Sequence, residues 1–226
     1  MVEIRYLSTN AVVVYKDYGV PSQPDPSGDL DALTATSELL KARGESSELW
    51  LINRLDRGVA GLMIFARSKC SAADLSALVR DRQIIKEYFA VVEGKTESGT
   101  MLDFLYKDSR TSKAYVVSRE RSGVKRASLA YETIETVVTE SGEMSLVKIS
   151  LETGRFHQIR AQFSSRNHPI VGDKKYGSRI NMRGGIALMS CRLSASVMGE
   201  SIDIKAYPAI DKLPWSVFDL NKILGE

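Results

Sequence analysis

Short apolar strand patterns with very short connections constrain this chain more than any other feature of its sequence. Residues 129–139 and 144–151 both have strand character, and only residues 140–143 separate them. Because a parallel connection needs about a dozen residues or more, these two strands must form an antiparallel hairpin. The other strands are expected at 11–15, 59–66, 86–93, 186–193 and 201–207, and helices at 29–43, 71–82 and 155–165. The pattern predicts an α+β protein with a mixed, largely antiparallel sheet flanked by helices and loops.

The length and composition favour one globular domain. The chain has 226 residues, of which 43% are hydrophobic and 26% charged, and it shows no repeat or linker. We therefore expect a single catalytic domain over residues 1–226. The longest apolar stretch, residues 58–66, is far shorter than the ~20 residues that a membrane-spanning helix needs. The two cysteines and two histidines offer no zinc ligand pattern. We expect a cytoplasmic monomer that holds no metal.

The net charge of +3 hides an uneven distribution of charge. Residues 105–126 contain seven Lys or Arg against two acids, a balance of +5, and residues 154–192 contain eight against one, a balance of +7. The rest of the chain therefore carries 3 − 12 = −9. An acidic body with two basic segments is typical of a protein that binds a polyanion such as RNA. The alternative is that both segments are merely solvated loops.

The sequence Asn-Arg-Leu-Asp-Arg-Gly-Val-Ala-Gly at 53–61 places a carboxylate between two arginines, just before a buried strand. A guanidinium stabilises the charged form of a nearby carboxylate, so this pattern favours an ionised Asp56. An ionised carboxylate can act as a nucleophile or as a general base. A lone Arg-x-Asp is more often a turn with a surface ion pair, so the motif needs support from elsewhere in the chain.

Two further segments carry residues suited to a site. In residues 153–160, helical spacing puts Arg160 beside an apolar side formed by Phe156, Ile159 and Phe163, which would hold its guanidinium rigidly for bidentate pairing. A lone His157 is more often structural than catalytic. In residues 86–94, strand alternation puts Tyr88 on the same face as Lys86. A strand tyrosine usually packs in the core, and its rival use is as a platform for a nucleobase.

Together with the segment His-Pro-Ile-Val-Gly-Asp-Lys-Lys-Tyr-Gly at 168–177, these stretches resemble the RluA-like pseudouridine synthases. That family isomerises uridine in ribosomal and transfer RNA. Its motifs are Arg-Leu-Asp, Lys-x-Tyr, Gly-Arg-x-His-Gln-Ile-Arg and His-Pro-Ile-x-Gly-Asp-x-x-Tyr-Gly, and all four occur here in the family order. The likeness extends from about residue 12 to residue 193. Each motif alone is weak to moderate, but four in register make coincidence very improbable.

The resemblance implies a pseudouridine synthase fold with a central cleft, and an isomerase that acts on RNA without a cofactor. Asp56 would be the catalytic aspartate, Tyr88 would lie against the target base, and Arg160 would pair with Asp56. Arg54 would fill the space left by the flipped nucleotide. Further substrate contacts would come from Lys86, Arg155, His157 and Gln158. Asp56 would act at C1′ or at C6, or would deprotonate C2′, and the resemblance leaves these three routes open.

Some positions depart from the family pattern. Asn53 replaces a histidine, Val59 and Ala60 replace Thr and Ser, and Lys16 is not followed by proline. These changes affect substrate contacts rather than the proposed catalytic residues. We also expect no separate N-terminal RNA-binding module, because the catalytic pattern begins by about residue 11. Two rival functions are a catalytically idle RNA-binding protein of the same fold and a metal-independent hydrolase that uses Asp56 as its nucleophile.

Overall fold

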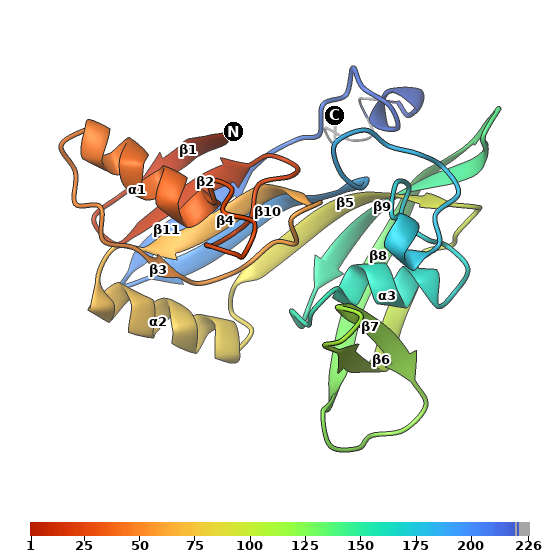
Figure 1. Cartoon of the computed structure of the whole chain (residues 1–226), viewed down its shortest axis with the longest axis horizontal. Helices are drawn as coiled ribbons and strands as arrows, with labels where there is room; N and C mark the ends of the chain where they lie inside the picture. The colour runs from red at the N-terminus through yellow and green to blue at the C-terminus, as the bar shows by residue number, and fades with distance from the viewer. Residues whose placement is uncertain (220, 222–226) are drawn as a thin grey trace. The chain divides into compact units, whose positions relative to one another are not determined.

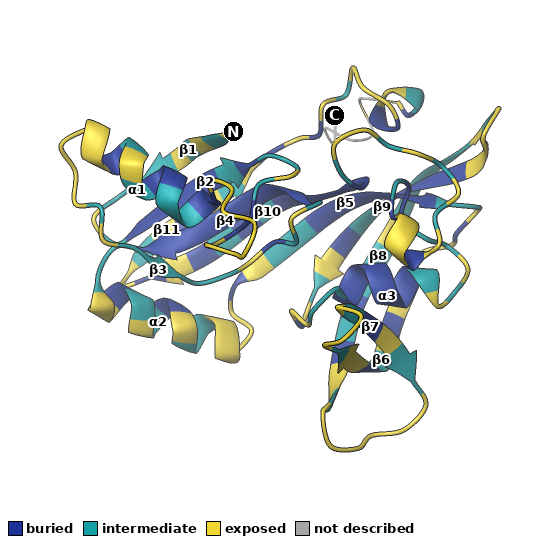
Figure 2. Cartoon of the chain, in the orientation of Figure 1, coloured by how far each residue is buried: buried dark blue, intermediate teal, exposed yellow. Residues whose placement is uncertain are grey.

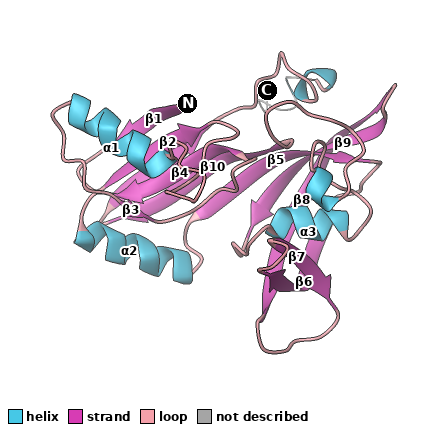
Figure 3. Cartoon of the chain, viewed as in Figure 1, coloured by secondary structure: helices cyan, strands magenta, loops and turns pink. Residues whose placement is uncertain are grey.

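The computed structural model describes residues 1–219 and residue 221, which form two compact units. Unit 1 comprises Met1–Lys86 and Met189–Ala206, and unit 2 comprises Glu87–Leu188 and the chain from Tyr207 onward. Figure 1 labels the helices and strands, and Figure 3 shows that strands dominate both units. The prediction of one catalytic domain over residues 1–226 stays a prediction.

Unit 1 is built on a sheet with the order β1-β2-β4-β10, in which β11 pairs with β10 and β3 pairs with β4. All of these pairs are antiparallel except β4 with β10, which is parallel. The mixed, largely antiparallel sheet expected from the sequence is confirmed here. The strands are β1 (Val2–Leu7), β2 (Ala11–Lys16), β3 (Trp50–Leu51), β4 (Ala60–Ala66), β10 (Leu188–Val197) and β11 (Glu200–Lys205).

The strand that follows Asp56 lies at the centre of this sheet. All seven residues of β4 are buried, which confirms the buried strand expected at 59–66, although the strand begins at Ala60. Gly61 has a φ of +117°, and a Cβ atom there would collide with main-chain atoms of Ser190. Glycine is therefore required where β4 runs against β10, because any side chain would force the two strands apart.

Two helices accompany this sheet, α1 (Ala32–Ala42) and α2 (Lys69–Arg80). Both begin at side-chain caps, because the side chain of Asp31 accepts from the Thr34 amide and that of Ser68 accepts from the Ser71 amide. The expected helices at 29–43 and 71–82 are thus confirmed, with shifted ends. Leu75 of α2 is buried, whereas Val79 is 37% exposed.

Unit 2 contains antiparallel strands in the order β5-β9-β8-β6-β7. The predicted hairpin is confirmed, with its turn at residues 140–141. The sequence did not reveal β6 and β7, because their side chains are mixed in polarity and many remain exposed or half-buried (Figure 2). The strands are β5 (Ile85–Glu93), β6 (Gly99–Asp108), β7 (Lys113–Val117), β8 (Val124–Thr139) and β9 (Gly142–Leu151).

The helix expected at 155–165 forms only over Gln158–Ser164, which is α3. His157 has a φ of +51°, a left-handed conformation that interrupts the helix on its N-terminal side. Ile159 and Phe163 are buried, as predicted, whereas Phe156 precedes the helix and is partly buried in a cluster with Leu105 and Tyr176. Two short 3₁₀ helices follow, η1 (Lys174–Tyr176) and η2 (Trp215–Val217). Among the described residues, no helix is long and apolar enough to cross a membrane.

Candidate active site

Asp56 lies in unit 1, in the loop that leads into β4. Its main-chain oxygen accepts a hydrogen bond from the Val59 amide at 3.0 Å, which closes a turn over Gly58. The turn before a buried strand is therefore confirmed. Asp56 itself is half-buried, while its neighbour Leu55 is buried. The carboxylate thus lies at a surface whose main chain is anchored in the core.

The main chain on both sides of Asp56 is held by the segment that follows β2. The Ser22 hydroxyl donates to the Leu55 carbonyl at 2.7 Å and accepts from the Leu55 amide at 3.0 Å. On the other side, the Gly19 amide donates to the Arg57 carbonyl at 2.8 Å. These bonds fix the residues before and after Asp56, so the main chain that carries the carboxylate is held in place.

Lys16, at the end of β2, is fully buried beside this turn. Its ammonium group donates to the carbonyl oxygens of Asp17 at 3.1 Å, Val20 at 2.8 Å and Arg57 at 3.5 Å. Burial lowers the pKa of Lys16 to about 8, and the negative charges of Asp56 and Asp17 oppose this shift. This role could not be predicted from the sequence, since a lysine at the end of a strand is usually solvated.

The lowered pKa of Lys16 predicts a pH dependence of stability. Between pH 8 and 10.5, the unfolded chain binds the lysine proton more strongly than the folded chain, so the free energy of unfolding rises with pH. We expect Lys16 to contribute a rise of about 3 kcal/mol across this window. Lys16→Met lacks this contribution, so the stability of the parent relative to the variant should increase from pH 8 to pH 10. Urea unfolding of both proteins at several pH values measures this difference in stability. Curves of unfolding free energy against pH that run parallel for the two proteins would contradict the prediction.

The neighbours of Asp56 differ in their environments. Arg54 is exposed, as a residue that contacts substrate must be, and its predicted role stays a prediction. Arg57 forms an ion pair with Asp29, so it is partly engaged away from Asp56. Asn53, which replaces the family histidine, accepts a hydrogen bond from the Ile64 amide at 2.9 Å through its side-chain oxygen. Asn53 therefore ties the loop that carries Asp56 to β4.

The strand β5 carries Lys86 and Tyr88, the next predicted site residues. Lys86 is half-buried, and burial lowers its pKa. Tyr88 is 6% exposed and stands opposite Ile149 of β9. Since residues on both faces of β5 are buried from Tyr88 onward, strand alternation alone does not separate a ligand face from a core face. The role of Tyr88 against a base stays a prediction.

Arg160 is a residue of α3, and a carboxylate of unit 2 holds its guanidinium in place. Its Nε donates to Asp173 Oδ2 at 2.6 Å and its Nη2 to Asp173 Oδ1 at 2.9 Å, a bidentate pair in which Asp173 is 1% exposed. The guanidinium carbon also lies 4.9 Å from the centre of the Tyr176 ring. A planar guanidinium bound at its edge and stacked on one face has little freedom to turn. The bidentate pairing predicted for Arg160 is present with Asp173, and its pairing with Asp56 stays a prediction.

Tyr176 is fixed in turn by the surrounding chain. Its hydroxyl accepts from the Ala114 amide at 2.7 Å and lies 3.0 Å from His157 Nδ1. The Lys113 ammonium stands 4.9 Å from the centre of the Tyr176 ring. His157 therefore contributes to the support of Arg160 through Tyr176, in keeping with its structural interpretation.

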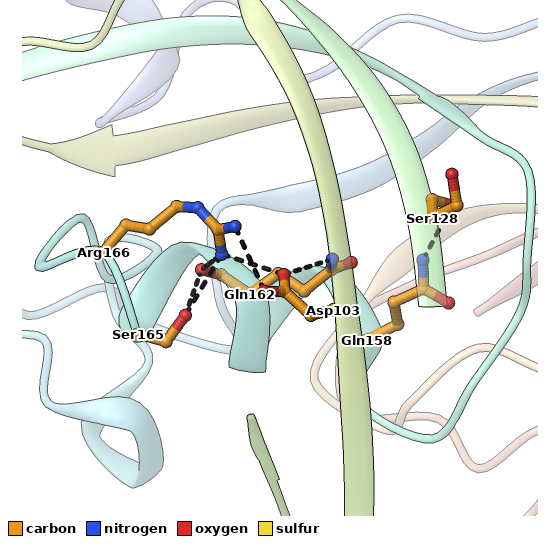
Figure 4. Close-up of polar contacts among 6 residues, drawn as sticks. All are labelled: Asp103, Ser128, Gln158, Gln162, Ser165 and Arg166. Atoms are coloured by element: carbon orange, nitrogen blue, oxygen red, sulfur yellow. Dashed lines mark hydrogen bonds and ion pairs between the residues drawn. The ribbon is translucent and has the colours of Figure 1, made fainter. Parts of the chain in front are cut away.

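Gln158 and Arg155 bind the chain at the start of α3. The side-chain oxygen of Gln158 accepts from the Thr153 hydroxyl at 2.7 Å and from the Arg155 amide at 3.0 Å. Its amide nitrogen donates to the Ser128 carbonyl at 3.0 Å (Figure 4). Arg155 is exposed and donates from Nε to the Arg126 carbonyl at 3.0 Å. Gln158 thus anchors the start of α3, and the substrate contacts predicted for these residues stay predictions.

The other end of α3 is fastened to β6. Figure 4 shows Gln162 and Arg166 converging on Asp103. Gln162 Nε2 donates to Asp103 Oδ2 at 2.8 Å, and Arg166 binds both carboxylate oxygens at 2.9 and 3.2 Å. These contacts and those of Gln158 hold both ends of the helix, so Arg160 projects from a rigid support.

Asp173 and Tyr176 had no assigned role in the sequence analysis, although both belong to the motif at 168–177. One signal pointed to Asp173, because it is the only acid among the eight cations of residues 154–192. A lone acid in such a segment is well placed to pair with one of its cations. Its pairing with Arg160 depends on the path of the loop between them, which the spacing of the motifs does not reveal.

Comparison with known proteins identifies the family. The family model described as RNA pseudouridylate synthase matches residues 10–165. The chain belongs to this family. The region matched by the family model includes Asp56, Tyr88 and Arg160. The resemblance inferred from the four motifs is thereby confirmed at the level of the family.

The sequences of curated relatives align with most of this chain. It is 29% identical over 184 residues to the Ribosomal large subunit pseudouridine synthase D of Borreliella burgdorferi, covering 78% of the chain and 55% of that protein. It is 30% identical over 231 residues to an uncharacterized RNA pseudouridine synthase of Aquifex aeolicus, covering 98% of the chain and 69% of that protein. The chain thus spans little more than half of the Borreliella protein.

A solved structure confirms the predicted fold. Human RNA Pseudouridylate Synthase Domain Containing 1 superposes with a TM-score of 0.79 at 21% identity, covering 100% of this chain and 94% of that chain. Human RNA Pseudouridylate Synthase Domain Containing 4 gives a TM-score of 0.74 at 22% identity, covering 92% and 89%. This family member therefore has the pseudouridine synthase fold, with a mostly antiparallel sheet and α1, α2 and α3 among its described residues.

Proposed function

We propose that this protein is an RNA pseudouridine synthase that isomerises uridine in ribosomal or transfer RNA. In this reaction the bond between C1′ and N1 breaks, the retained base turns, and C1′ joins C5. The proton on C5 leaves and N1 gains a proton, so the composition of the nucleoside does not change. The observation that carries the proposal is the family match together with the four motifs in their order.

Asp56, Tyr88 and Arg160 are the proposed catalytic residues. The loop that carries Asp56 has its main chain fixed on both sides, which favours a reproducible position for a nucleophile or base. Arg160 is likewise fixed, by Asp173 and Tyr176. A rigid charged group that is already oriented before the reaction costs little reorganisation in the transition state.

The RNA partner is supported by the basic and aromatic surface of unit 2. Tyr106 of β6 and Tyr115 of β7 stand opposite each other, and they are 36% and 40% exposed. Arg121 lies 5.4 Å from the centre of the Tyr106 ring, and Lys113 lies 5.4 Å from that of Tyr115. Exposed aromatic rings flanked by cations suit bases and phosphates of an unpaired RNA strand.

The affinity for RNA should fall steeply with salt. Each phosphate neutralised by a cation releases condensed counterions, so log K falls linearly with log salt by about 0.7 to 0.9 per phosphate contacted. Filter binding of an unmodified ribosomal RNA transcript between 50 and 300 mM potassium chloride, a range of about 0.8 log units, measures the slope. A flat dependence would show that the basic side chains do not face RNA. The candidates for charge removal are Lys113, Arg119, Lys174, Lys175, Arg179 and Arg183.

One assay tests the proposed function and separates its rivals. The purified protein is incubated with unmodified ribosomal and transfer RNA transcripts, which are then digested to nucleosides and separated. We expect pseudouridine to appear in a defined RNA. Free uracil would instead indicate the hydrolase, and bound but unchanged RNA would indicate a catalytically idle RNA-binding protein.

A further inference from the structure

Four exposed cations lie on one segment of unit 2, residues 174–183, which we call the basic loop. They are Lys174, Lys175, Arg179 and Arg183. Within the part of the chain that the structure describes, none of their side chains makes an ion pair or a hydrogen bond. Cations without carboxylate partners on a protein surface are available to an external anion. The basic loop therefore has the charge of a phosphate-binding surface.

One carboxylate is the first anchor of the basic loop. Glu93, the last residue of β5, accepts three hydrogen bonds at Oε1: from the Ser178 hydroxyl at 2.6 Å, the Arg179 amide at 2.8 Å and the Ile180 amide at 3.1 Å. The charge of Glu93 is thus satisfied by the main chain and a hydroxyl of the loop. The guanidinium of Arg179 takes no part in this contact.

A second anchor lies at Gly172. Its amide is within hydrogen-bond distance of the Ser178 hydroxyl at 3.0 Å and of the Ile180 carbonyl at 3.1 Å. A Cβ atom at Gly172 would come within 2.7 Å of Met182 Cβ, so the loop packs directly against this glycine. The φ of Gly172 is +86°, which also favours glycine. Ser178 and Met182, at the two ends of this segment, therefore both lie against Gly172.

We propose that Glu93 is a positioning residue that holds the basic loop in the conformation that binds the phosphate backbone of the substrate RNA. This inference rests on the proposed function, since it names a surface that the isomerase would use for its substrate. An acid next to an RNA-binding surface weakens binding by its charge alone. Glu93 therefore improves affinity only by ordering the loop, which lowers the entropy that RNA binding would otherwise cost.

Two substitutions of Glu93 separate ordering from charge. Both Glu93→Leu and Glu93→Gln remove the negative charge, but only glutamine keeps an oxygen that can accept from the loop. Charge alone predicts that both variants bind an unmodified ribosomal RNA transcript more tightly than the parent. We expect Glu93→Leu to weaken binding about tenfold and Glu93→Gln to bind at least as tightly as the parent. The turnover rate at saturating RNA should stay within about twofold of the parent for both, because Glu93 lies outside the proposed catalytic residues.

A third variant tests the loop without disturbing its anchors. Arg179→Ala with Arg183→Ala should weaken binding and reduce the slope of log K against log salt by about one per cation removed. Parent-like RNA affinity in this variant, or tighter binding by Glu93→Leu, would overturn the inference. The parent is assayed for pseudouridine in the same RNA. Absence of pseudouridine there and in unmodified transfer RNA transcripts refutes the proposed function, whereas pseudouridine formation with unchanged affinity of the variants refutes only the role of Glu93 and the basic loop.

Discussion

Asp56→Asn should abolish isomerisation while RNA binding survives. The turn that holds this residue is closed by the main-chain oxygen of Asp56, so asparagine preserves it. The substitution removes a nucleophilic or basic carboxylate with almost no change in volume. Loss of a group with such a role reduces the turnover rate by about four orders of magnitude or more. Single-turnover formation of pseudouridine with excess protein over a ribosomal RNA transcript measures the effect.

A matched control for this variant is Asp25→Asn. Asp25 is an exposed acid of the same unit that binds Ser27, and its replacement changes the net charge of the protein by the same amount. We expect Asp25→Asn to retain the activity of the parent. A turnover rate of Asp56→Asn within a few fold of the parent would refute the catalytic assignment of Asp56.

Arg160→Met should lower the turnover rate by about 10² to 10³, the cost of removing one preorganised charged group from an active site. Arg160→Lys keeps the charge but loses the planar fork that spans both oxygens of Asp173 and lies over Tyr176. We therefore expect the lysine variant to be impaired as well, though less than the methionine variant. Single-turnover rates of both variants, measured with RNA affinity, test this order.

The loss of a buried ion pair also destabilises the fold, and this effect has to be separated from catalysis. Arg160→Met leaves the buried Asp173 without this guanidinium, which typically costs about 3–5 kcal/mol of stability. The double variant Arg160→Met with Asp173→Asn removes both charges and should recover most of that stability. If the double variant regains stability and remains inactive, Arg160 acts in catalysis. Recovery of activity together with stability would show that Arg160 is only structural.

Sequence reasoning predicted the parts of the fold that local patterns determine. The β8–β9 hairpin follows from the short connection between two strand patterns, and the turn at Asp56 follows from glycine just before an apolar run. The strands β6 and β7 escaped prediction, because half-exposed strands with charged residues lack a clear apolar alternation. The start of α3 was placed too early, because the left-handed conformation of His157 is not visible in helical spacing.

The candidate site could likewise be predicted from the sequence only in part. Asp56, Tyr88 and Arg160 could be named from the order of the motifs, since those residues carry the family likeness. Their supports could not be named. The burial of Lys16 and the pairing of Arg160 with Asp173 both depend on how distant loops fold back, and no local period encodes such a contact.

The most direct test of the central claim is release of tritium from RNA that carries tritium on C5 of its uridines. Isomerisation joins C5 to C1′ and therefore expels the C5 hydrogen, while the mass of an unlabelled RNA stays the same. We predict that the parent releases tritium in step with the appearance of pseudouridine, without free uracil, and that Asp56→Asn releases none. Retention of all the tritium by RNA incubated with folded, RNA-binding parent protein would contradict the account.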